Sequence, residues 1–381
     1  MPDPQPPAPL RTPLAAVHHD LGATMTDFAG WLMPLRYRSE TAEHKAVRSA
    51  AGLFDLSHMG ELQVVGDGAA SALDYALTGQ ASAIAPGRAR YTMICAPDGG
   101  VIDDLIVYRL ADTEYLIVAN ASNAQTVAGE LTDRVAGRGA TVADRTAEYA
   151  LVAIQGPRAE GILGKLTSTD LGQVRYYAIH PAKVAGRDAL LARTGYTGED
   201  GFEIFVGPHD AVAIWHALTE AGDGEGLVPA GLAARDSLRL EAGMPLYGNE
   251  LSRDVTPFDA GLGRVVKLDK PGDFVGRAAL ADLAMAEPTR ELVGLIGQSR
   301  RVPRHGYPVL WDGVQCGIVT SGVPSPTLGQ PIAMAYIAAK VATQARASGG
   351  DGQGRLYVDV RGTAEPASLV ALPFYKRPAG H

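Results

Sequence analysis

The chain of 381 residues exceeds the length that one hydrophobic core usually supports, so we expect two or three domains, each with its own core. Hydrophobic residues account for 46% of the chain and charged residues for 20%, a composition that is typical of globular proteins and excludes disordered and collagen-like chains. The formal net charge of −8 argues against a nucleic acid as the main partner, although it leaves room for a local basic patch.

The first segment, residues 1–11, is rich in proline, which removes backbone donors and resists helix formation. We therefore expect a mobile tail, with folded structure beginning near Thr12. The segment also lacks the apolar centre of a secretory signal, and no uninterrupted run of about 18 apolar residues occurs in the chain. These observations predict a cytoplasmic protein that does not enter a membrane.

Strands and single helices alternate over residues 12–285. Ser39 is suited to cap a helix over residues 40–51 that Gly52 ends, and residues 53–65 alternate between apolar and polar as a strand does. This alternation favours an α+β fold with antiparallel strands. Other helices are predicted over 67–77, over 124–135 and up to residue 166, and other strands over 91–94, 101–110, 115–119, 150–154, 188–193 and 203–206, with a hairpin turn at 97–100.

The pattern changes after a boundary at residues 285–290, where the sequence MAEPTR reads as a linker. Short strands interrupted by glycine and proline predict a small β-barrel or sandwich over residues 290–378. The run at residues 349–354 is a second loop candidate because it is rich in glycine. The predicted strands of this domain are 292–296, 307–310, 315–320, 332–337 and 355–360.

Several motifs of known chemistry are absent. The sequence contains no phosphate-binding P-loop, no GxSxG nucleophile elbow and no HExxH zinc motif. The glycine pairs at residues 66–68 and 261–263 lack the remaining glycines of a dinucleotide fingerprint, so we expect neither nicotinamide nor flavin. Cys95 and Cys316 lie far apart without metal-ligand spacing, which predicts buried free thiols and no metal site.

Asp103 and Asp104 are the first candidates for chemistry. They lie at the start of an apolar strand, where side chains alternate, so only one of them is expected to face a pocket. The other should face solvent or a partner backbone. A carboxylate in such a place acts as a general base or stabilises a nearby cation, but Asp also favours turns for structural reasons.

Two further segments are dense in polar residues. Residues 193–201 contain three glycines that allow a close approach of the backbone to a flat ligand, with Tyr196 available for stacking, or they form a tight hairpin. Arg235 lies near the start of a helical pattern over residues 233–241. Its guanidinium is suited to clamp a carboxylate, or it pairs with an Asp on the surface.

Taken together, these segments resemble the glycine cleavage T-protein family from about Arg11 to Lys376. The family's fold is three domains in a ring around a central folate cavity, with a C-terminal β-domain closing one side. The resemblance therefore implies a tetrahydrofolate-binding region over residues 12–285, built from two interleaved α+β subdomains. The matching blocks, in family order, are 11–14, 27–35, 55–61, 99–108, 193–203, 231–249, 320–326 and 373–375.

The same resemblance implies roles for individual residues. Asp104 matches the second aspartate of the family's Asp-Asp-Leu-Ile motif and would be the key acid at the folate's reactive nitrogens, with Asp103 in support. Glu203 would hydrogen-bond the pterin ring, and Arg235 would meet the polar tail of the folate. Arg264 departs from the family, where many members carry an aromatic residue, and would reshape a stacking contact. The other implied folate-binding residues are Met59 (through its backbone), Tyr91, Asn120, Tyr196, Arg304 and Lys376.

The implied activity is that of a tetrahydrofolate-dependent aminomethyltransferase, whose partner is the lipoylated H-protein of the glycine cleavage system. An alternative is a related folate-dependent demethylase, or the folate half of an oxidase, although this chain shows no flavin domain. A third alternative is a non-catalytic folate-binding scaffold. Such scaffolds usually lack the Asp-Asp motif, which is intact here at Asp103 and Asp104.

Overall fold

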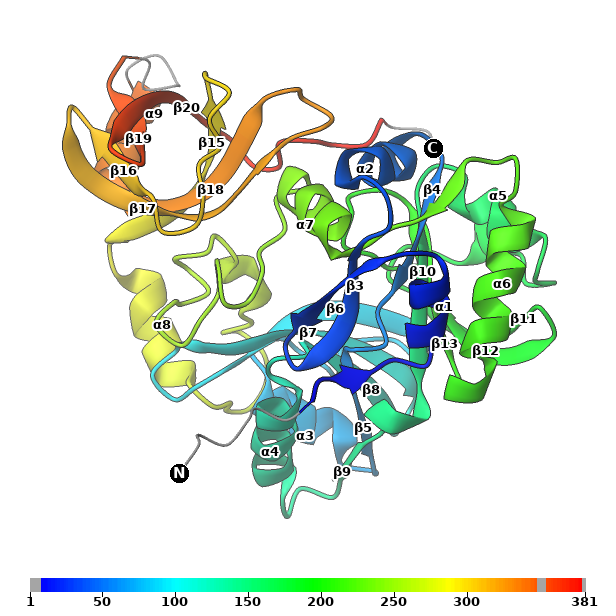
Figure 1. Ribbon diagram of the computed structural model, residues 1–381. Coiled ribbons are helices and arrows are strands. Elements are labelled where there is room, and N and C mark those ends of the chain that lie inside the picture. The colour runs from blue at the N-terminus through cyan, green and yellow to red at the C-terminus, as the bar shows by residue number, and fades with distance from the viewer. Residues whose placement is uncertain (1–7, 348–353, 379–381) are drawn as a thin grey trace, which may run out of the picture. The chain divides into compact units, whose positions relative to one another are not determined.

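The computed structural model describes residues 8–347 and 354–378 (Figure 1). Most of the predicted tail and all but one residue of the glycine-rich run 349–354 lie outside this described part. The remaining chain divides into two compact units. The first unit contains residues up to 61 together with 144–195 and 199–235, and the second contains residues 62–143, 196–198 and those from 236 onward.

A six-stranded sheet forms the centre of the first unit. Its strands are antiparallel except that β14 runs parallel to β4. Helices α5 (Ala159–Gly164) and α6 (Ala211–Ala221) pack on β10 and β13 and bury Trp215. The strand order is β11 (Ile179–Val184), β12 (Arg187–Ala192), β13 (Gly201–Val206), β10 (Ala150–Gln155), β4 (Ala51–Asp55) and β14 (Leu227–Pro229).

The N-terminal part of this unit forms a small sheet of its own. Its strand β1 (Leu10–Arg11) pairs in parallel with β3 (Trp31–Arg36), so the folded structure begins two residues before the predicted start. The pairing supplies backbone partners that the proline pattern alone does not reveal. The other elements are β2 (Thr24–Phe28), α1 (Ala15–Asp20) and α2 (Glu40–Ser49), and Ser39 caps α2 as predicted.

The predicted single strand over residues 53–65 is in fact two strands. A turn at residues 56–59, closed by a hydrogen bond from the Met59 amide to the Leu56 carbonyl (3.0 Å), separates β4 from β5 (Gly60–Val65). The sequence marks this turn only by two adjacent polar residues, Ser57 and His58, and both are buried as strand residues often are. The turn therefore breaks a segment that the period-two pattern presents as continuous.

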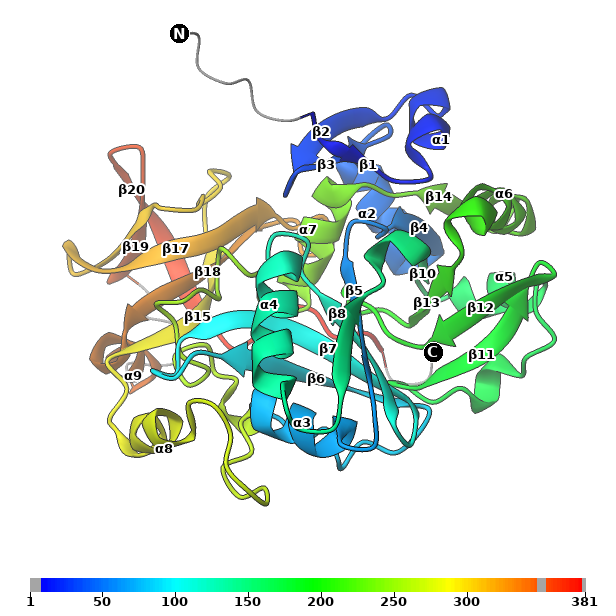
Figure 2. The ribbon, with the colours of Figure 1, turned by 90° about the horizontal axis from the view of Figure 1, so that it is seen from below.

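A five-stranded sheet and a closed barrel make up most of the second unit. Helices α3 (Ala69–Ala76) and α4 (Ala124–Val135) lie side by side on one face of the sheet, as Figures 1 and 2 show. The predicted hairpin turn is present, with Gly99 at φ 90° where a side chain would be strained. The strand order is β6 (Arg88–Cys95), β7 (Val101–Ala111), β8 (Glu114–Ala119), β5 and β9 (Thr141–Asp144).

The C-terminal strands close into a barrel, which decides between the predicted barrel and sandwich and confirms the α+β class with a C-terminal barrel. Helix α9 (Ala339–Ala347) contributes Val341, Ala342 and Ala345 to the barrel core. Helix α8 (Arg277–Met285) precedes the barrel. The strand order is β15 (Arg290–Gly297), β18 (Pro331–Ala338), β17 (Val314–Pro324), β16 (Pro308–Trp311), β19 (Leu356–Val360) and β20 (Thr363–Val370).

Helix α7 (Leu232–Glu241) is anchored at its C-terminal end by buried charges. Arg239 is 1% exposed and pairs with the fully buried Glu250, with 2.8 Å between Nη1 and Oε2. A second guanidinium nitrogen of Arg239 donates to the Ser321 hydroxyl of β17 at 2.7 Å. The carboxylate of Glu241 accepts the hydroxyl of Thr327 at 2.7 Å. These bonds tie the end of α7 to the barrel within the second unit.

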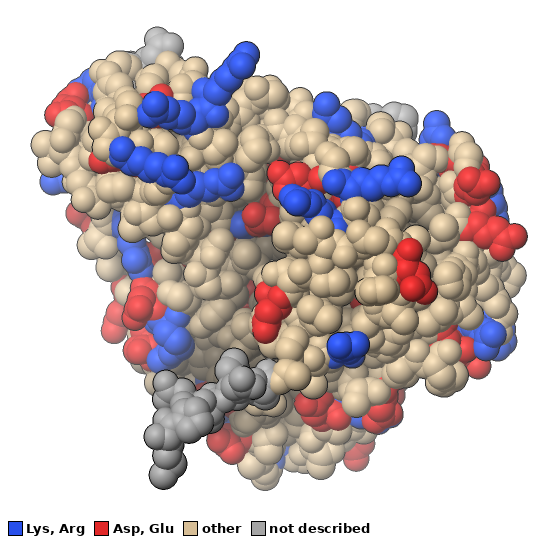
Figure 3. Space-filling model, viewed as in Figure 1, with Lys and Arg blue, Asp and Glu red and all other residues tan. Residues whose placement is uncertain are grey.

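The acidic net charge is unevenly distributed over the surface. Lys and Arg side chains gather over the barrel on the face that Figure 3 shows. The segment 299–305 of the barrel contains three exposed arginines, Arg300, Arg301 and Arg304. This is the local basic patch for which the composition leaves room. None of the helices in the described part of the chain has the length and apolar character needed to cross a membrane.

Candidate active site

Asp104 is held by two donors at the start of β7. Its Oδ2 accepts the hydroxyl of Tyr91, which extends from β6, at 3.0 Å. Its Oδ1 accepts the side-chain amide of Asn120, which follows β8, at 2.8 Å. Asp104 as a residue is partly exposed, and the two bonds fix the orientation of its carboxylate. The structure therefore brings Asp104, Tyr91 and Asn120 together, as the family resemblance implies.

Asp103, the residue before Asp104 in β7, is completely buried. Its Oδ2 accepts the backbone N–H of Asn120 at 3.0 Å, and its Oδ1 accepts the side-chain amides of Asn120 (2.8 Å) and Asn123 (2.7 Å). Of the two adjacent aspartates, Asp103 is therefore the one that bonds to the backbone of a neighbouring segment. The Asn120 amide nitrogen nevertheless contacts both carboxylates, next to a register shift between β6 and β7 at Ile94, where the strands twist more strongly.

The two carboxylates titrate in an unusual range. Burial, followed by the charge of Asp104, raises the pKa of Asp103 to about 7, against the opposing effect of the hydrogen bonds from Asn123 and Asn120. Burial also raises the pKa of Asp104, against the opposing effect of hydrogen bonds from Tyr91 and Asn120. Such a pair holds or releases a proton close to neutral pH, which is the range in which a general acid-base group is most effective.

Two residues of this cluster were not identified from the sequence. Asn123 donates to Asp103, and Tyr247 lies close enough that burial and then the charges of Asp103 and Asp104 raise its pKa. The spacing of Asn120 and Asn123 at the junction between a predicted strand and a predicted helix was an available signal. No such signal existed for Tyr247, because only the tertiary structure brings this residue near Asp103 and Asp104.

The predicted pterin-binding residue Glu203 lies in the first unit. It extends from β13 and accepts a short hydrogen bond from the hydroxyl of Thr194, whose carbonyl in turn accepts the side-chain amide of Gln155 at 3.0 Å. Thr194 is 3% exposed and Glu203 is partly exposed. One side of the Glu203 carboxyl is therefore fixed by the protein while part of the group remains accessible.

Met59 and Arg235 also belong to the first unit. Met59 is partly exposed at the end of the turn that follows β4. The charge of Arg235 reaches the neighbouring His58, whose pKa is lowered to about 4 by burial first and by Arg235 second. His58 is therefore neutral at physiological pH, and it does not compete as a cation with Arg235 for an anionic ligand.

A buried network supports the turn that carries His58 and Met59. Asp55 accepts the hydroxyl of Thr12 at 2.6 Å and contacts His18 Nε2 at 2.8 Å, and its other oxygen accepts the Ser57 amide at 2.9 Å. Burial alone would raise the pKa of Asp55, but the hydrogen bonds from His18 and Thr12 and the charge of His18 outweigh burial and hold it below its ordinary value.

This depressed pKa predicts a pH-dependent stability. The contribution of Asp55 is fully present above its unfolded-state pKa of about 4 and is lost as the pH falls through the lower folded-state value. The stability difference between wild type and Asp55→Asn should be about 1–3 kcal/mol at pH 7 and shrink below pH ~4. Urea unfolding at several pH values measures it, and a difference that does not change with pH would contradict the assignment.

The remaining predicted residues lie in the second unit, which also contains the carboxylate cluster. The hydroxyl of Tyr196 donates a short hydrogen bond to the Pro245 carbonyl. Arg304 is exposed and donates to the Gly322 carbonyl at 3.3 Å, and Lys376 is exposed near the C-terminus. Arg264, which replaces the usual aromatic residue, is exposed as well. The assignment of Tyr196, Arg304 and Lys376 to a folate site stays a prediction.

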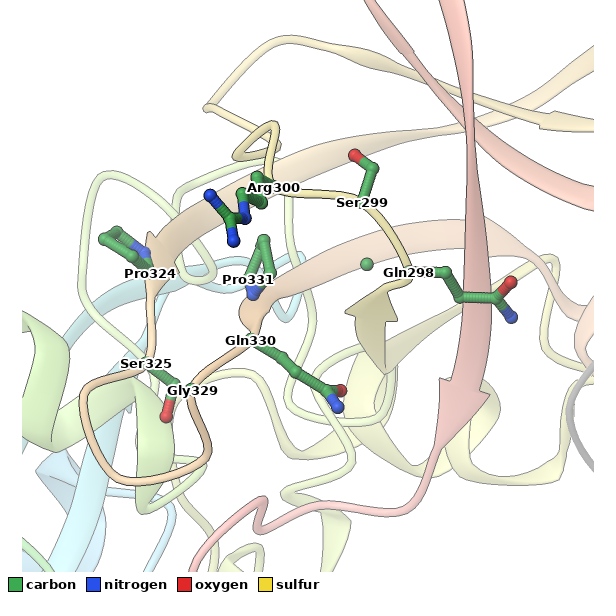
Figure 4. Close-up of a pocket in the computed structure, with 9 residues that line it drawn as sticks. Gln298, Ser299, Arg300, Pro324, Ser325, Gly329, Gln330 and Pro331 are labelled. Carbon is green, nitrogen blue, oxygen red and sulfur yellow. The ribbon is translucent and has the colours of Figure 1, made fainter.

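A cavity of about 680 Å³ opens on the barrel and does not include any of the predicted site residues (Figure 4). Polar groups of the segment that follows β15 and of the connection between β17 and β18 line it. Its lining residues are Gly297, Gln298, Ser299, Arg300, Pro324, Ser325, Gly329, Gln330 and Pro331. The carboxylate cluster is therefore the stronger candidate for the chemistry.

Comparison with known proteins gives consistent matches. Residues 14–270 match the family described as GCVT N-terminal domain, and residues 290–376 match the glycine cleavage T-protein C-terminal barrel domain. An aminomethyltransferase of Streptomyces avermitilis is 62% identical over 97% of this chain and 98% of its own, and one of Bacillus subtilis is 44% identical over 96% and 99%. The solved structure of the glycine cleavage system aminomethyltransferase T from Bartonella henselae matches with a TM-score of 0.88. Its sequence is 36% identical, and the match covers 96% of this chain and 98% of that one.

Proposed function

This chain belongs to the glycine cleavage T-protein family of aminomethyltransferases, and from that premise we propose that its Asp104 carboxylate carries out the acid-base chemistry of the transfer. The donor is an aminomethyl group on the lipoyl arm of H-protein, and the acceptor is tetrahydrofolate. The single observation that supports this role most strongly is the carboxylate of a partly exposed residue, fixed by Tyr91 and Asn120 beside a second, buried carboxylate.

The reaction breaks the bond between carbon and nitrogen in the aminomethyl group with assistance from sulfur, and ammonia leaves. A folate nitrogen attacks the carbon, the bond to sulfur breaks, and the second folate nitrogen closes the ring. The products are ammonia, the reduced lipoyl thiol and 5,10-methylenetetrahydrofolate, so the two folate N–H protons end on ammonia and on the thiol. Each step places positive charge on carbon or requires removal of a proton.

Asp104 is suited to both requirements. A fixed anion in a partly desolvated site stabilises developing positive charge without reorganisation, and burial raises its pKa, which makes the carboxylate a stronger base than an exposed one. Tyr91 and Asn120 keep the carboxylate in one orientation. Positioning of the two substrates supplies much of the remaining acceleration.

The folate itself is held, in this proposal, by the region 12–285, with further contacts from the barrel domain 290–378. Glu203 binds the pterin ring, as its partly exposed carboxyl beside Thr194 permits. Arg235 meets the polar tail, next to a neutral His58. The other proposed contacts are Met59, Tyr91, Asn120, Tyr196, Arg304 and Lys376. A cytoplasmic location stays a prediction from the sequence.

Replacement of Arg235 by Ala is expected to weaken tetrahydrofolate binding by about ten- to hundredfold, because a charge-assisted hydrogen bond to the folate carboxylate is lost. A fluorescence or calorimetric titration with tetrahydrofolate measures the dissociation constant. Arg175→Ala, at an exposed position of the same unit, is the matched control and should bind as wild type. An unchanged titration for Arg235→Ala would remove this residue from the folate site.

The proposed reaction is tested with tetrahydrofolate and aminomethyl-loaded H-protein. Ammonia and methylenetetrahydrofolate should appear in equal amounts, and neither should appear when tetrahydrofolate or the loaded carrier is omitted. Turnover of O-methyl or S-methyl donors in place of the carrier would favour the demethylase alternative. Tight folate binding without either product would favour the scaffold.

A further inference from the structure

Asn123 occupies the N-cap position of α4 but does not cap the helix. Asn is among the residues most often used there, because its side-chain oxygen accepts an exposed amide of the first helical turn. The Asn123 side chain makes no such bond, although its carbonyl accepts the Val127 amide at 2.8 Å as helix geometry requires. The side chain is therefore directed to something other than the helix.

The amide nitrogen of Asn123 points instead to the buried carboxylate. It donates to Asp103 Oδ1 at 2.7 Å and lies 3.3 Å from the Ile102 carbonyl. The backbone amide of Asn123 also donates to the Asn120 carbonyl at 2.9 Å, which fixes the turn between β8 and α4. Asn123 thus holds both Asp103 and the backbone of Asn120.

A continuous set of hydrogen bonds leads from Asn123 to Asp104. Asp103 Oδ1 accepts both Asn123 and the Asn120 amide, and the same Asn120 nitrogen donates to Asp104 Oδ1. Since an amide group has only two N–H bonds in one plane, the position of Asp103 restricts the plane of the Asn120 amide and hence the direction of its bond to Asp104. A shift of Asp103 would be transmitted to Asp104.

We propose that Asn123 is a positioning residue for the aminomethyl transfer, which orients the Asp104 carboxylate through Asp103 and Asn120 and keeps a negative charge on Asp103 beside it. The inference rests on the proposed catalytic role of Asp104. It also gives Asp103 a definite task, since its carboxylate is buried and does not reach solvent.

The charges around Asp103 determine the sign of the expected pH effect. The charge that acts on Asp103 directly is the Asp104 carboxylate on the same strand. The other titratable groups nearby are the Tyr91 hydroxyl from β6, which donates to Asp104, and the Tyr247 hydroxyl from the segment after α7, on which the charges of Arg253 and Asp254 also act. The Asn123 amide lowers the pKa of Asp103. Its removal leaves Asp103 protonated to higher pH, so the rise of turnover with pH should move to higher pH.

Asn123→Ser tests the proposal. Neither Ser nor Ala is long enough to reach Asp103, so Asn123→Ser, which keeps a polar side chain before α4, and Asn123→Ala should behave alike. Both variants should lose about ten- to hundredfold in kcat, as expected when a reacting group is misplaced, with a shift of the pH profile to higher pH and a nearly unchanged dissociation constant for tetrahydrofolate. Ser122→Ala, at an exposed neighbouring position, should match wild type.

Two results would overturn the inference. One is wild-type turnover and an unshifted pH profile in Asn123→Ser, measured beside an inactive Asp104→Asn. The other is a fall in turnover without any pH shift, which would indicate a purely structural role. If Asp104→Asn itself retains full turnover, the proposed catalytic role fails instead, so the parallel measurement separates the two failures.

Discussion

Replacement of Asp104 by Asn is expected to lower the rate of methylenetetrahydrofolate formation by about two or more orders of magnitude, the range typical of a general acid-base group. The amide has nearly the shape of the carboxylate, and its oxygen can accept from the Asn120 amide while its nitrogen donates to the Tyr91 hydroxyl, which accepts as well as donates, so the site should keep its structure. It carries no charge and does not accept a proton. The dissociation constant of tetrahydrofolate should therefore stay within about tenfold of wild type.

The measurement is a single-turnover experiment that follows ammonia and methylenetetrahydrofolate together, combined with a folate titration. Asp112→Asn is the matched control, because Asp112 is an exposed aspartate between β7 and β8 and should not affect turnover. Near-normal product formation by Asp104→Asn would remove this carboxylate from the catalytic role. A loss of folate binding that accounts for the whole effect would reassign it to binding.

Replacement of Glu250 by Ala is expected to destabilise the protein by about 3 kcal/mol, because it removes the buried anion that pairs with the guanidinium of Arg239. The pair is 1% and 0% exposed, so water does not compensate for the loss. The carboxylate of Asp236, which is 42% exposed, still pairs with Arg239 Nε at 2.8 Å, and the other remaining acceptors, the Ser321 hydroxyl and the Met244 carbonyl, carry no charge. The effect should appear as a large drop in the urea concentration at the unfolding midpoint.

The control for this prediction is an ion pair on the surface. Asp312 and Arg355 are each close to half exposed, and Asp312→Ala should cost no more than about 1 kcal/mol. A double variant that replaces both Arg239 and Glu250 with Leu should be less destabilised than Glu250→Ala, because no unpaired charge remains. Equal stability of Glu250→Ala and Asp312→Ala would show that the buried pair is not an important contribution.

Local sequence patterns predicted those elements whose boundaries depend on nearby residues. Helix α4 spans the predicted residues 124–135, since apolar side chains repeat at helical spacing and Asn123 precedes them. Five of the six barrel strands were predicted near their observed positions because glycine and proline mark their ends, whereas β20 was not predicted. The strand predicted over 53–65 was wrong, because a turn marked only by two adjacent polar residues, Ser57 and His58, divides it.

The candidate site was predictable in part. Asp103 and Asp104 stand out as adjacent carboxylates before an apolar strand, and the family resemblance added Tyr91 and Asn120, which the structure places on Asp104. The contact of one amide with both carboxylates depends on the register of β7 against β8, in which Ile106 lies opposite Val118, and no local pattern encodes that register. Asn123 was not identified, because its contact with Asp103 joins residues 20 positions apart in the chain.

The most direct test of the central claim is a crystal structure with tetrahydrofolate bound, in which the distance between the Asp104 carboxylate and the reactive folate nitrogens is measured. The account predicts a carboxylate oxygen within hydrogen-bond reach of one of these nitrogens, at about 2.6–3.2 Å or through one water. A folate bound with these nitrogens far from Asp104, and with that carboxylate directed into bulk solvent, would contradict it.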